Sequence, residues 1–211
     1  VVGQQFHQFK RGHRSFHLIP RHHIYGFPYI QSCAFPYGQC ESLVVLRLKL
    51  RNKVIQVAKL DLVIFGASSF VGSILARYIA EQYGIDGDLK WAIAGRSEPK
   101  LQKVRGSLAK YLGPEAGKLE IILADASDMD DLKELCNRTR VVVSTVGPYA
   151  LYGEPLIEAC VETGTDYCDL TGEPQWIRRM LDKYEERAKE NRARIVHCCG
   201  FDSIPSDMGV W

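Results

Sequence analysis

The sequence predicts an α/β fold built on a doubly wound parallel sheet, and three observations support that prediction. From residue 59 onward, short apolar runs alternate with segments of helical length and periodicity. A small-residue turn, Gly66–Gly72, joins the first apolar run to the first helical segment. The chain of 211 residues, 46% of them hydrophobic, is long enough to bury a sizeable core. Strands and helices that alternate in this way form a parallel sheet covered by helices on both faces.

Six strands are expected, each in a run of apolar residues. The run Val141–Val146 is rich in β-branched side chains and is therefore expected in the centre of the sheet. The six expected strands are Leu62–Phe65, Trp91–Ala94, Glu120–Ala124, Val141–Val146, Asp166–Leu170 and Arg194–Cys198. Together they predict a Rossmann-type domain over residues 59–200.

Helices are expected between these strands, because apolar residues recur there with the spacing of one helix face. The first helix is expected to end at Gly84, the fourth to run from Pro155 to Gly164, and the fifth to begin at Pro174. The expected inward-facing residues of the first helix are Val71, Ile74, Leu75, Tyr78 and Ile79; those of the second are Leu101, Val104 and Leu108; those of the third are Met129, Leu132 and Leu135.

The first 58 residues differ in composition from the rest of the chain. They carry eight Lys or Arg and one acidic residue, a net charge of +7, whereas residues 59–211 carry 19 basic and 24 acidic residues, a net charge of −5. Residues 1–58 are predicted to be a disordered or non-native N-terminal extension. An organelle-targeting segment and a nucleic-acid-binding arm are the alternatives, and the prediction for the whole chain is that it binds no nucleic acid.

Cysteine usage and hydropathy indicate the compartment. The seven cysteines are odd in number and lack the spacing of a zinc site, so buried free thiols and no metal are expected. The longest apolar stretch of the first part, Leu43–Leu50, is too short and too charged to span a bilayer. A cytoplasmic protein without a transmembrane segment is predicted, and peripheral association with a membrane is left open.

The turn Gly66–Gly72 is the first candidate site, because it lies where such folds place a helix N-terminus against a dinucleotide pyrophosphate. Gly66 is expected to make the sharp turn, and Gly72 to let the helix lie close to the strand. Ser69 stands where the fingerprint has a glycine, which makes the motif imperfect. The predicted contacts in this turn are Gly66, Ala67, Ser68, Ser69, Phe70, Val71 and Gly72.

Three further strand exits are candidate cofactor contacts, because ligands of open α/β sheets bind outside the carboxyl ends of the strands. Arg96 and Ser97 follow the second strand and suit the 2′-phosphate of NADP; a solvated arginine beside a helix cap is the alternative. Asp125 follows the third strand and suits the adenine or its ribose, or else caps the next helix. Gly147, Pro148 and Tyr149 follow the fourth, and would let the nicotinamide half approach the backbone or merely form a loop.

Several familiar catalytic motifs are absent. The chain has no Tyr-x-x-x-Lys pair, no Gly-x-x-x-x-Gly-Lys-Ser/Thr loop and no Gly-x-Ser-x-Gly, which disfavours short-chain dehydrogenases, nucleotide triphosphatases and α/β-hydrolases. His197, the one histidine after residue 58, lies in an expected strand and is predicted to be a core residue. The sequence assigns no catalytic residue.

From about Leu60 to Trp211, the chain resembles the saccharopine dehydrogenase-like oxidoreductases, a family that includes the trans-acting enoyl reductases. The matching segments are Phe65–Gly72, Ala94–Ser97 with Lys100 and Leu101, Val146–Tyr149, Tyr152–Pro155, Asp169–Pro174 and Gly200–Asp207. The resemblance implies an NADP-binding Rossmann domain followed by a second α/β domain that completes the substrate site and often forms a dimer. That second, substrate domain is expected to be largely absent from this chain, with residues 201–211 as its truncated start.

The sequence therefore predicts an NADP(H)-dependent oxidoreductase, or the cofactor-binding part of one. In such an enzyme the protein binds and orients the dinucleotide, and the nicotinamide carries the hydride. The expected substrate is a small molecule or a lipid-linked group, and a homodimer through the missing domain is the expected assembly. A non-catalytic dinucleotide-binding or redox-sensing module is the alternative from another class, and an inert fragment is a third.

Overall fold

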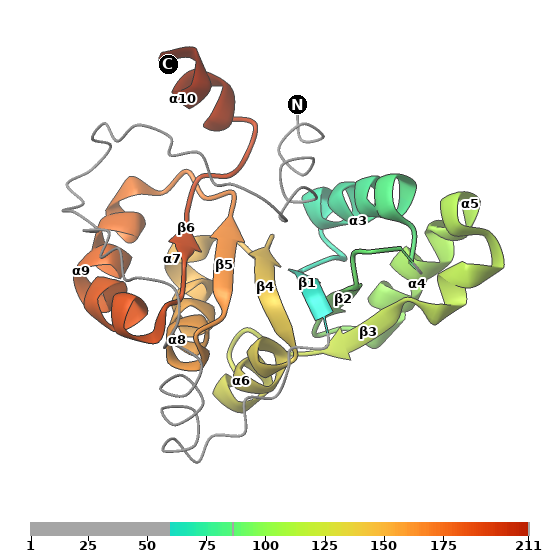
Figure 1. The fold of residues 1–211 in the computed structure, drawn as a ribbon, viewed down its shortest axis with the longest axis horizontal. Coiled ribbons are helices and arrows are strands. Elements are labelled where there is room, and N and C mark those ends of the chain that lie inside the picture. The colour runs from blue at the N-terminus through green and yellow to red at the C-terminus, as the bar shows by residue number, and fades with distance from the viewer. Residues whose placement is uncertain (1–59, 86, 211) are drawn as a thin grey trace, which may run out of the picture. The chain divides into compact units, whose positions relative to one another are not determined.

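Six parallel strands form one sheet in the order β3-β2-β1-β4-β5-β6 (Figure 1). The computed structural model describes residues 60–85 and 87–210, so the predicted extension over residues 1–58 lies outside the described residues. The strands are β1 Leu60–Phe65, β2 Trp91–Gly95, β3 Glu120–Leu123, β4 Thr139–Ser144, β5 Asp166–Asp169 and β6 Ile195–Val196. This order is that of a doubly wound nucleotide-binding sheet, which confirms the predicted fold class.

The chain reverses its direction of winding between β1 and β4, which are hydrogen-bonded neighbours. Phe65 at the end of β1 is in register with Ala94 of β2 on one side and with Ser144 of β4 on the other. β1 and β2 are buried almost throughout, as expected for apolar strands in a parallel sheet covered on both faces. The exits of β1, β2 and β4 therefore meet at one edge of the sheet, at the switch point where such folds bind ligands.

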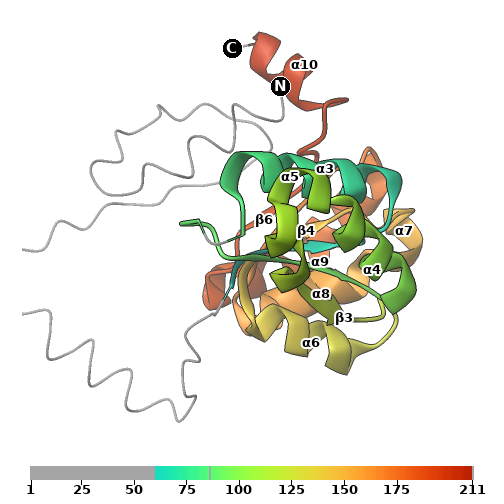
Figure 2. The ribbon, with the colours of Figure 1, turned by 90° about the vertical axis from the view of Figure 1, so that its right-hand side faces the viewer.

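Helices cover both faces of the sheet (Figure 2). On one face lie α3 Phe70–Tyr83, α4 Glu98–Ser107, α5 Ala109–Leu112 and the 3-10 turn η1 Gly113–Lys118. On the other face, α6 Met129–Asn137, α8 Glu154–Thr163 and α9 Pro174–Asn191 pack side by side. Two short helices, α7 Tyr149–Tyr152 and α10 Ile204–Val210, follow β4 and β6.

The main core lies between the sheet and α6, α8 and α9. Alternate residues of the strands, such as Val63 and Phe65, meet buried side chains of these helices, including Leu135, Ile157 and Trp176. Removal of this apolar area from water is the main stabilising contribution of the layer. Pro155 and Pro174 lie in the first turns of α8 and α9, as predicted, and Gly164 ends α8 in the left-handed conformation.

The buried face of α3 differs from the predicted one. Val71 and Ile74 were expected to face the core, but they are 41% and 42% exposed. Ile79 is buried, as predicted, but the rest of the face that packs on the sheet is a row of small residues: Gly72, Ala76 and Ala80. Their spacing of four residues places them in one line along the helix, and their size lets the helix backbone lie close to β1.

The last predicted strand is shorter than expected, and α7 and α10 were not predicted. β6 comprises only Ile195–Val196 instead of Arg194–Cys198. The strand ends early because Cys198 adopts a φ of 60° and donates its backbone N–H to the side chain of Asp169 instead of a neighbouring strand. In the described part of the chain, no helix has both the length and the apolar character needed to cross a membrane.

Candidate functional site

The turn after β1 has the geometry that its glycines predict. Gly66 adopts a φ of +84°, a conformation that other residues rarely adopt. Its N–H and that of Ala67 both donate to the carbonyl of Ala94 on β2, at 2.9 and 3.2 Å. Gly72 brings the first turn of α3 against this segment, because a Cβ there would lie 2.4 Å from the Gly66 carbonyl oxygen. Both glycines are required by local geometry.

Ser69, which replaces the usual glycine, is the N-cap of α3. It has an unstrained extended backbone with φ −71° and ψ 166°, and its Oγ accepts the N–H of Gly72 at 2.9 Å. The same Oγ lies 3.0 Å from Oγ1 of Thr145, the residue that follows β4. The serine side chain is thus held inside the protein, between the two strand exits. The Thr145 contact could not be predicted from local sequence, because the two residues are 76 positions apart.

The start of α3 retains unpaired backbone donors. Among the hydrogen bonds of the described residues, none uses the N–H groups of Ser68, Phe70 or Val71. The Phe70 side chain is 80% exposed, so the helix terminus opens to the surface. Unpaired N–H groups and the positive end of the helix dipole favour an anion at this position. The arrangement fits a phosphate group.

The exit of β2 presents a cation and a hydroxyl. Arg96 is exposed, and Ser97 takes the N-cap position of α4. Ser97 is thus the N-cap residue that the alternative expects, although its hydroxyl makes no capping hydrogen bond. Hydrogen bonds from the N–H and hydroxyl of Ser127 lower the pKa of Asp125, and the positive charge of Arg96 lowers it further. The exits that carry Arg96 and Asp125 are neighbours, since the Ala124 N–H donates to the Gly95 carbonyl at 3.2 Å.

Asp125 does not cap the helix that follows it. Its Oδ1 accepts the N–H and the hydroxyl of Ser127 at 2.9 and 2.7 Å, which fixes the loop after β3. The N-cap of α6 is Asp128, whose carboxylate accepts the N–H groups of Asp130 and Asp131. The capping alternative for Asp125 is wrong because the helix begins three residues later than that role requires.

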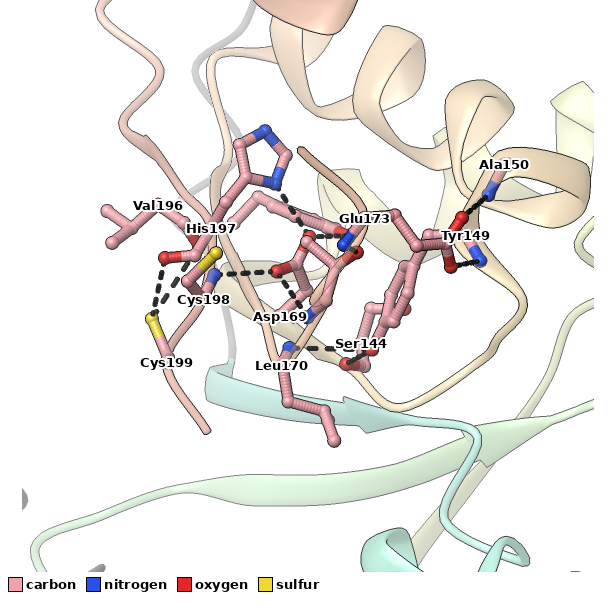
Figure 3. A network of polar contacts seen from close by, with 12 residues as sticks. Ser144, Tyr149, Ala150, Asp169, Leu170, Glu173, Val196, His197, Cys198 and Cys199 are labelled. Atoms are coloured by element: carbon pink, nitrogen blue, oxygen red, sulfur yellow. Dashed lines mark hydrogen bonds and ion pairs between the residues drawn. The ribbon is translucent and has the colours of Figure 1, made fainter. Parts of the chain in front are cut away.

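The exit of β4 is held by an internal carboxylate (Figure 3). Glu173, from the loop after β5, accepts the N–H of Tyr149 at 2.8 Å through Oε1 and that of Ala150 at 2.9 Å through Oε2. These are the first N–H groups of α7. A carboxylate thus occupies the position that an anionic ligand takes at an open helix terminus. Glu173 was not among the residues predicted for the site.

The Tyr149 side chain is turned into the core. It is 7% exposed, its ring lies 5.6 Å from that of Trp176, and its hydroxyl donates to the Ser144 carbonyl at 3.0 Å. Burial raises the pKa of this hydroxyl well above its ordinary range. Gly147 and Pro148 are exposed beside it. Of the three predicted contacts at this exit, only these two present their surfaces to a ligand.

A buried carboxylate, Asp169, joins β5 to β6 (Figure 3). Its oxygens accept the hydroxyl of Tyr167 at 2.9 Å and the N–H groups of Thr171 and Cys198, both at 3.1 Å. Nδ1 of His197 lies 2.7 Å from Oδ2 of the same carboxylate. The His197 side chain is 9% exposed, but the residue follows β6 instead of lying in the strand expected for it. Sequence reasoning missed Asp169, whose position at the end of a buried strand was the available signal.

The described cysteines are free, and the described residues form no metal cluster. Cys136 and Cys160 are buried, with their Sγ atoms 3.6 Å apart between α6 and α8. Over residues 60–85 and 87–210, no group of three or more His, Cys, Asp or Glu side chains is placed to hold a metal ion. The anion-fitting terminus of α3, together with Arg96 and Ser97, is therefore the arrangement with the clearest chemical use.

The chain is similar to several known proteins. Residues 62–196 match the model of the saccharopine dehydrogenase NADP binding domain. A trans-acting enoyl reductase of Mycobacterium tuberculosis is 44% identical over 151 residues, which are 72% of this chain and 34% of that protein. A lipid droplet localized protein of Caenorhabditis elegans is 40% identical over 154 residues, 73% of this chain and 36% of that protein. The chain thus spans about a third of the length of these curated relatives.

A solved structure of saccharopine dehydrogenase (L-Glu forming) from Saccharomyces cerevisiae is similar to this chain in fold. The TM-score is 0.52 at 21% sequence identity, and the match covers 68% of this chain and 28% of that one. At this level of identity the likeness concerns the arrangement of strands and helices alone.

Proposed function

The chain belongs to the family of saccharopine dehydrogenase NADP-binding domains, and from this premise we propose that it is the cofactor-binding part of an NADP(H)-dependent oxidoreductase. The relatives named as reductases favour this function over a non-catalytic sensing module. When bound, NADPH supplies the hydride, and the protein supplies its binding and orientation.

The observation that carries the proposal is the open N-terminus of α3. The unpaired N–H groups of Ser68, Phe70 and Val71 lie at the switch point of the sheet, next to a glycine with a φ of +84°. A dinucleotide needs such donors for its pyrophosphate, because each phosphate brings a negative charge out of water. Gly66–Gly72 would hold this part of the cofactor through its backbone. The side chains of Ala67 and Ser69 point into the protein.

The two ends of the cofactor are assigned to neighbouring strand exits. Arg96 and Ser97 would hold the 2′-phosphate, since a guanidinium and a free hydroxyl both donate to phosphate oxygens. Asp125 lies at the exit next to that of Arg96 and would border the adenosine. Exposed Gly147 and Pro148 would let the nicotinamide half pass close to the backbone after β4.

The substrate and location are proposed from the relatives. One is named as an enoyl reductase and another as a lipid droplet localized protein. We infer a lipid-linked substrate with a reducible double bond, and action of a cytoplasmic protein at a lipid surface. A small soluble substrate and a homodimer remain the other expectations for the complete enzyme.

The test of the proposed function is cofactor selectivity. A fluorescence titration of the chain with NADPH and NADH should show a preference for NADPH. In Arg96→Asp the preference should reverse, because the carboxylate repels the 2′-phosphate and accepts the 2′-hydroxyl of NADH; the NADPH:NADH affinity ratio should fall by about tenfold or more.

Lys103→Asp is the matched control. Lys103 is exposed on α4, and its replacement changes the net charge by the same amount, so general electrostatics alone would affect both variants equally. The ratio should stay unchanged in Lys103→Asp. An unchanged ratio in Arg96→Asp would contradict the assignment of the 2′-phosphate, and no binding of either dinucleotide would contradict the proposed function.

A further inference from the structure

Thr145 is the residue through which the exit of β4 touches the glycine turn after β1. Its N–H donates to the Phe65 carbonyl at 2.9 Å, which extends the pairing of β1 and β4 by one residue. Its Oγ1 lies 2.9 Å from the Gly66 carbonyl oxygen and 3.0 Å from Oγ of Ser69. The two exits are in close contact here, because a Cβ on Gly66 would lie 2.9 Å from the same Oγ1.

The direction of these hydrogen bonds follows from counting protons. A carbonyl oxygen only accepts, so the single proton of the Thr145 hydroxyl goes to the carbonyls beside it, that of Gly66 at 2.9 Å and that of Phe65 at 3.2 Å. Oγ1 must then accept from Ser69, whose own Oγ accepts the N–H of Gly72. The result is one directed hydrogen-bond chain from the Gly72 N–H through the Ser69 and Thr145 hydroxyls to the carbonyls at the start of the turn, of which that of Gly66 is the nearer.

This hydrogen-bond chain joins both ends of the turn that is assigned to the pyrophosphate. It starts at the third residue of α3, passes through the N-cap, and ends at the residue with positive φ. The Gly66 carbonyl also accepts the N–H of Ser69 at 2.9 Å, so both of its acceptor positions are used. The N–H groups that remain unpaired are those of Ser68, Phe70 and Val71. The hydrogen-bond chain fixes the backbone that carries them.

We propose that Thr145 is a positioning residue of the dinucleotide site: its hydroxyl fixes Ser69 and the Gly66–Gly72 turn in the shape that presents unpaired N–H groups to a pyrophosphate. This role rests on the NADP(H)-binding function proposed above. It also explains how the turn keeps its geometry with a serine in place of glycine, since the added hydroxyl has a partner from β4. Thr145 does not contact the ligand in this account and acts through Ser69.

The test compares four forms of the whole chain by fluorescence titration with NADPH. Thr145→Val keeps the shape and removes the hydroxyl, and its dissociation constant for NADPH should rise by about tenfold, the equivalent of one good hydrogen bond. Thr145→Ser restores a hydroxyl and should bind within about threefold of the wild type.

The matched control is Thr139→Val at the opposite end of the same strand. Thr139 is 3% exposed, and its hydroxyl bonds locally to the Val141 carbonyl at 3.0 Å. This variant also loses a buried hydroxyl and should lose stability in a thermal melt, but its affinity for NADPH should not change. If the role of Thr145 were purely structural, the two valine variants would have the same affinity for NADPH whenever their melting temperatures fell by the same amount.

A second ligand separates the turn from the rest of the site. Adenosine 2′-phosphate carries the group assigned to Arg96 but no pyrophosphate, so Thr145→Val should bind it as the wild type does. Equal NADPH affinity in Thr145→Val and wild type, or an equal loss in Thr139→Val, would overturn the role of Thr145 and leave the proposed function standing. A wild-type chain that does not bind NADPH would overturn both.

Discussion

Two helix N-termini lie at the same edge of the sheet, α3 after β1 and α7 after β4, and they differ in what meets their N–H groups. At α7 the Glu173 carboxylate accepts the first two N–H groups, those of Tyr149 and Ala150, at 2.8 and 2.9 Å. At α3 the described residues supply only the Ser69 hydroxyl, which accepts one N–H, that of Gly72. The fold places both termini where a ligand binds, but only α3 keeps donors for one.

Position in the fold does not by itself make an anion site. Glu173 belongs to the loop after β5, so a neighbouring strand exit closes the terminus of α7 with a charge-assisted pair of hydrogen bonds. At the terminus of α3, Thr145 after β4 instead forms a hydrogen bond with the side chain of the N-cap residue, Ser69. The remaining N–H groups of this terminus have no partner among the described residues. One terminus is therefore closed by the protein itself, and the other keeps the donors that the proposed pyrophosphate site requires.

The largest effect is expected when the turn at α3 is distorted. In Gly72→Ala the new Cβ would lie 2.4 Å from the Gly66 carbonyl oxygen and 2.8 Å from the Ala67 Cα, so the helix must move away from the turn. The free energy of unfolding should fall by about 3 kcal/mol, and NADPH binding should be lost in a fluorescence titration.

Gly106→Ala provides the control for this substitution, because a Cβ on this α4 residue meets nothing within 4 Å. It should raise the free energy of unfolding by about 0.5–1 kcal/mol and leave NADPH affinity unchanged. NADPH affinity that survives in Gly72→Ala would show that the close approach of helix and turn is not needed for binding.

An intermediate effect is expected when α7 is made to resemble α3. Glu173→Ala removes the carboxylate and leaves the N–H groups of Tyr149 and Ala150 without their acceptor. Urea denaturation should show a loss of about 2 kcal/mol, since hydrogen bonds to a charged group are broken. Glu190→Ala, at an exposed position of α9, should change the free energy of unfolding by less than about 0.5 kcal/mol. Equal losses in both variants would remove the basis for treating α7 as internally closed.

The smallest effect is expected from the Tyr149 hydroxyl. Tyr149→Phe removes its hydrogen bond to the Ser144 carbonyl and should cost about 1 kcal/mol of stability at neutral pH. Burial raises the pKa of this hydroxyl above its ordinary 10.0, so the folded state favours the neutral form. The stability that the neutral Tyr149 hydroxyl contributes is present below pH 10, and it is lost as the pH rises toward the pKa of the folded state.

Urea denaturation from pH 8 to 11 measures this contribution. The wild type should lose more stability than Tyr149→Phe above pH 10, because the variant has no phenol to ionise. Parallel pH profiles for the two proteins would show that the hydroxyl is not held in its neutral form.

Much of the fold followed from local sequence patterns, and much of the site did not. Apolar runs located all six strands, and Pro174 and Gly164 marked helix ends correctly, because these signals act over a few residues. The turn Gly66–Gly72 was also visible, since positive φ and close approach both require glycine. Short elements such as α7 and α10 carry too few residues to show a period.

The missing part consists of contacts between distant segments. Ser69 forms a hydrogen bond with Thr145, 76 positions away, and Tyr149 forms one with Glu173, 24 positions away. A single sequence shows that a carboxylate follows β5, but not that it reaches the N–H groups after β4. The exposure of Val71 had the same origin, because the helix face that packs on the sheet is formed by Gly72 and the residues in line with it.

The most direct measurement is an amide NMR titration of the ¹⁵N-labelled chain with 2′-phospho-ADP-ribose, which carries the pyrophosphate and the 2′-phosphate but no nicotinamide. The account predicts saturable downfield shifts of the Ser68, Phe70 and Val71 amide protons, because these donors gain charged acceptors. The amides of Tyr149 and Ala150, already bonded to Glu173, should move little. Unmoved amides at Ser68, Phe70 and Val71 under saturating ligand, or larger shifts at Tyr149 and Ala150, would contradict the account.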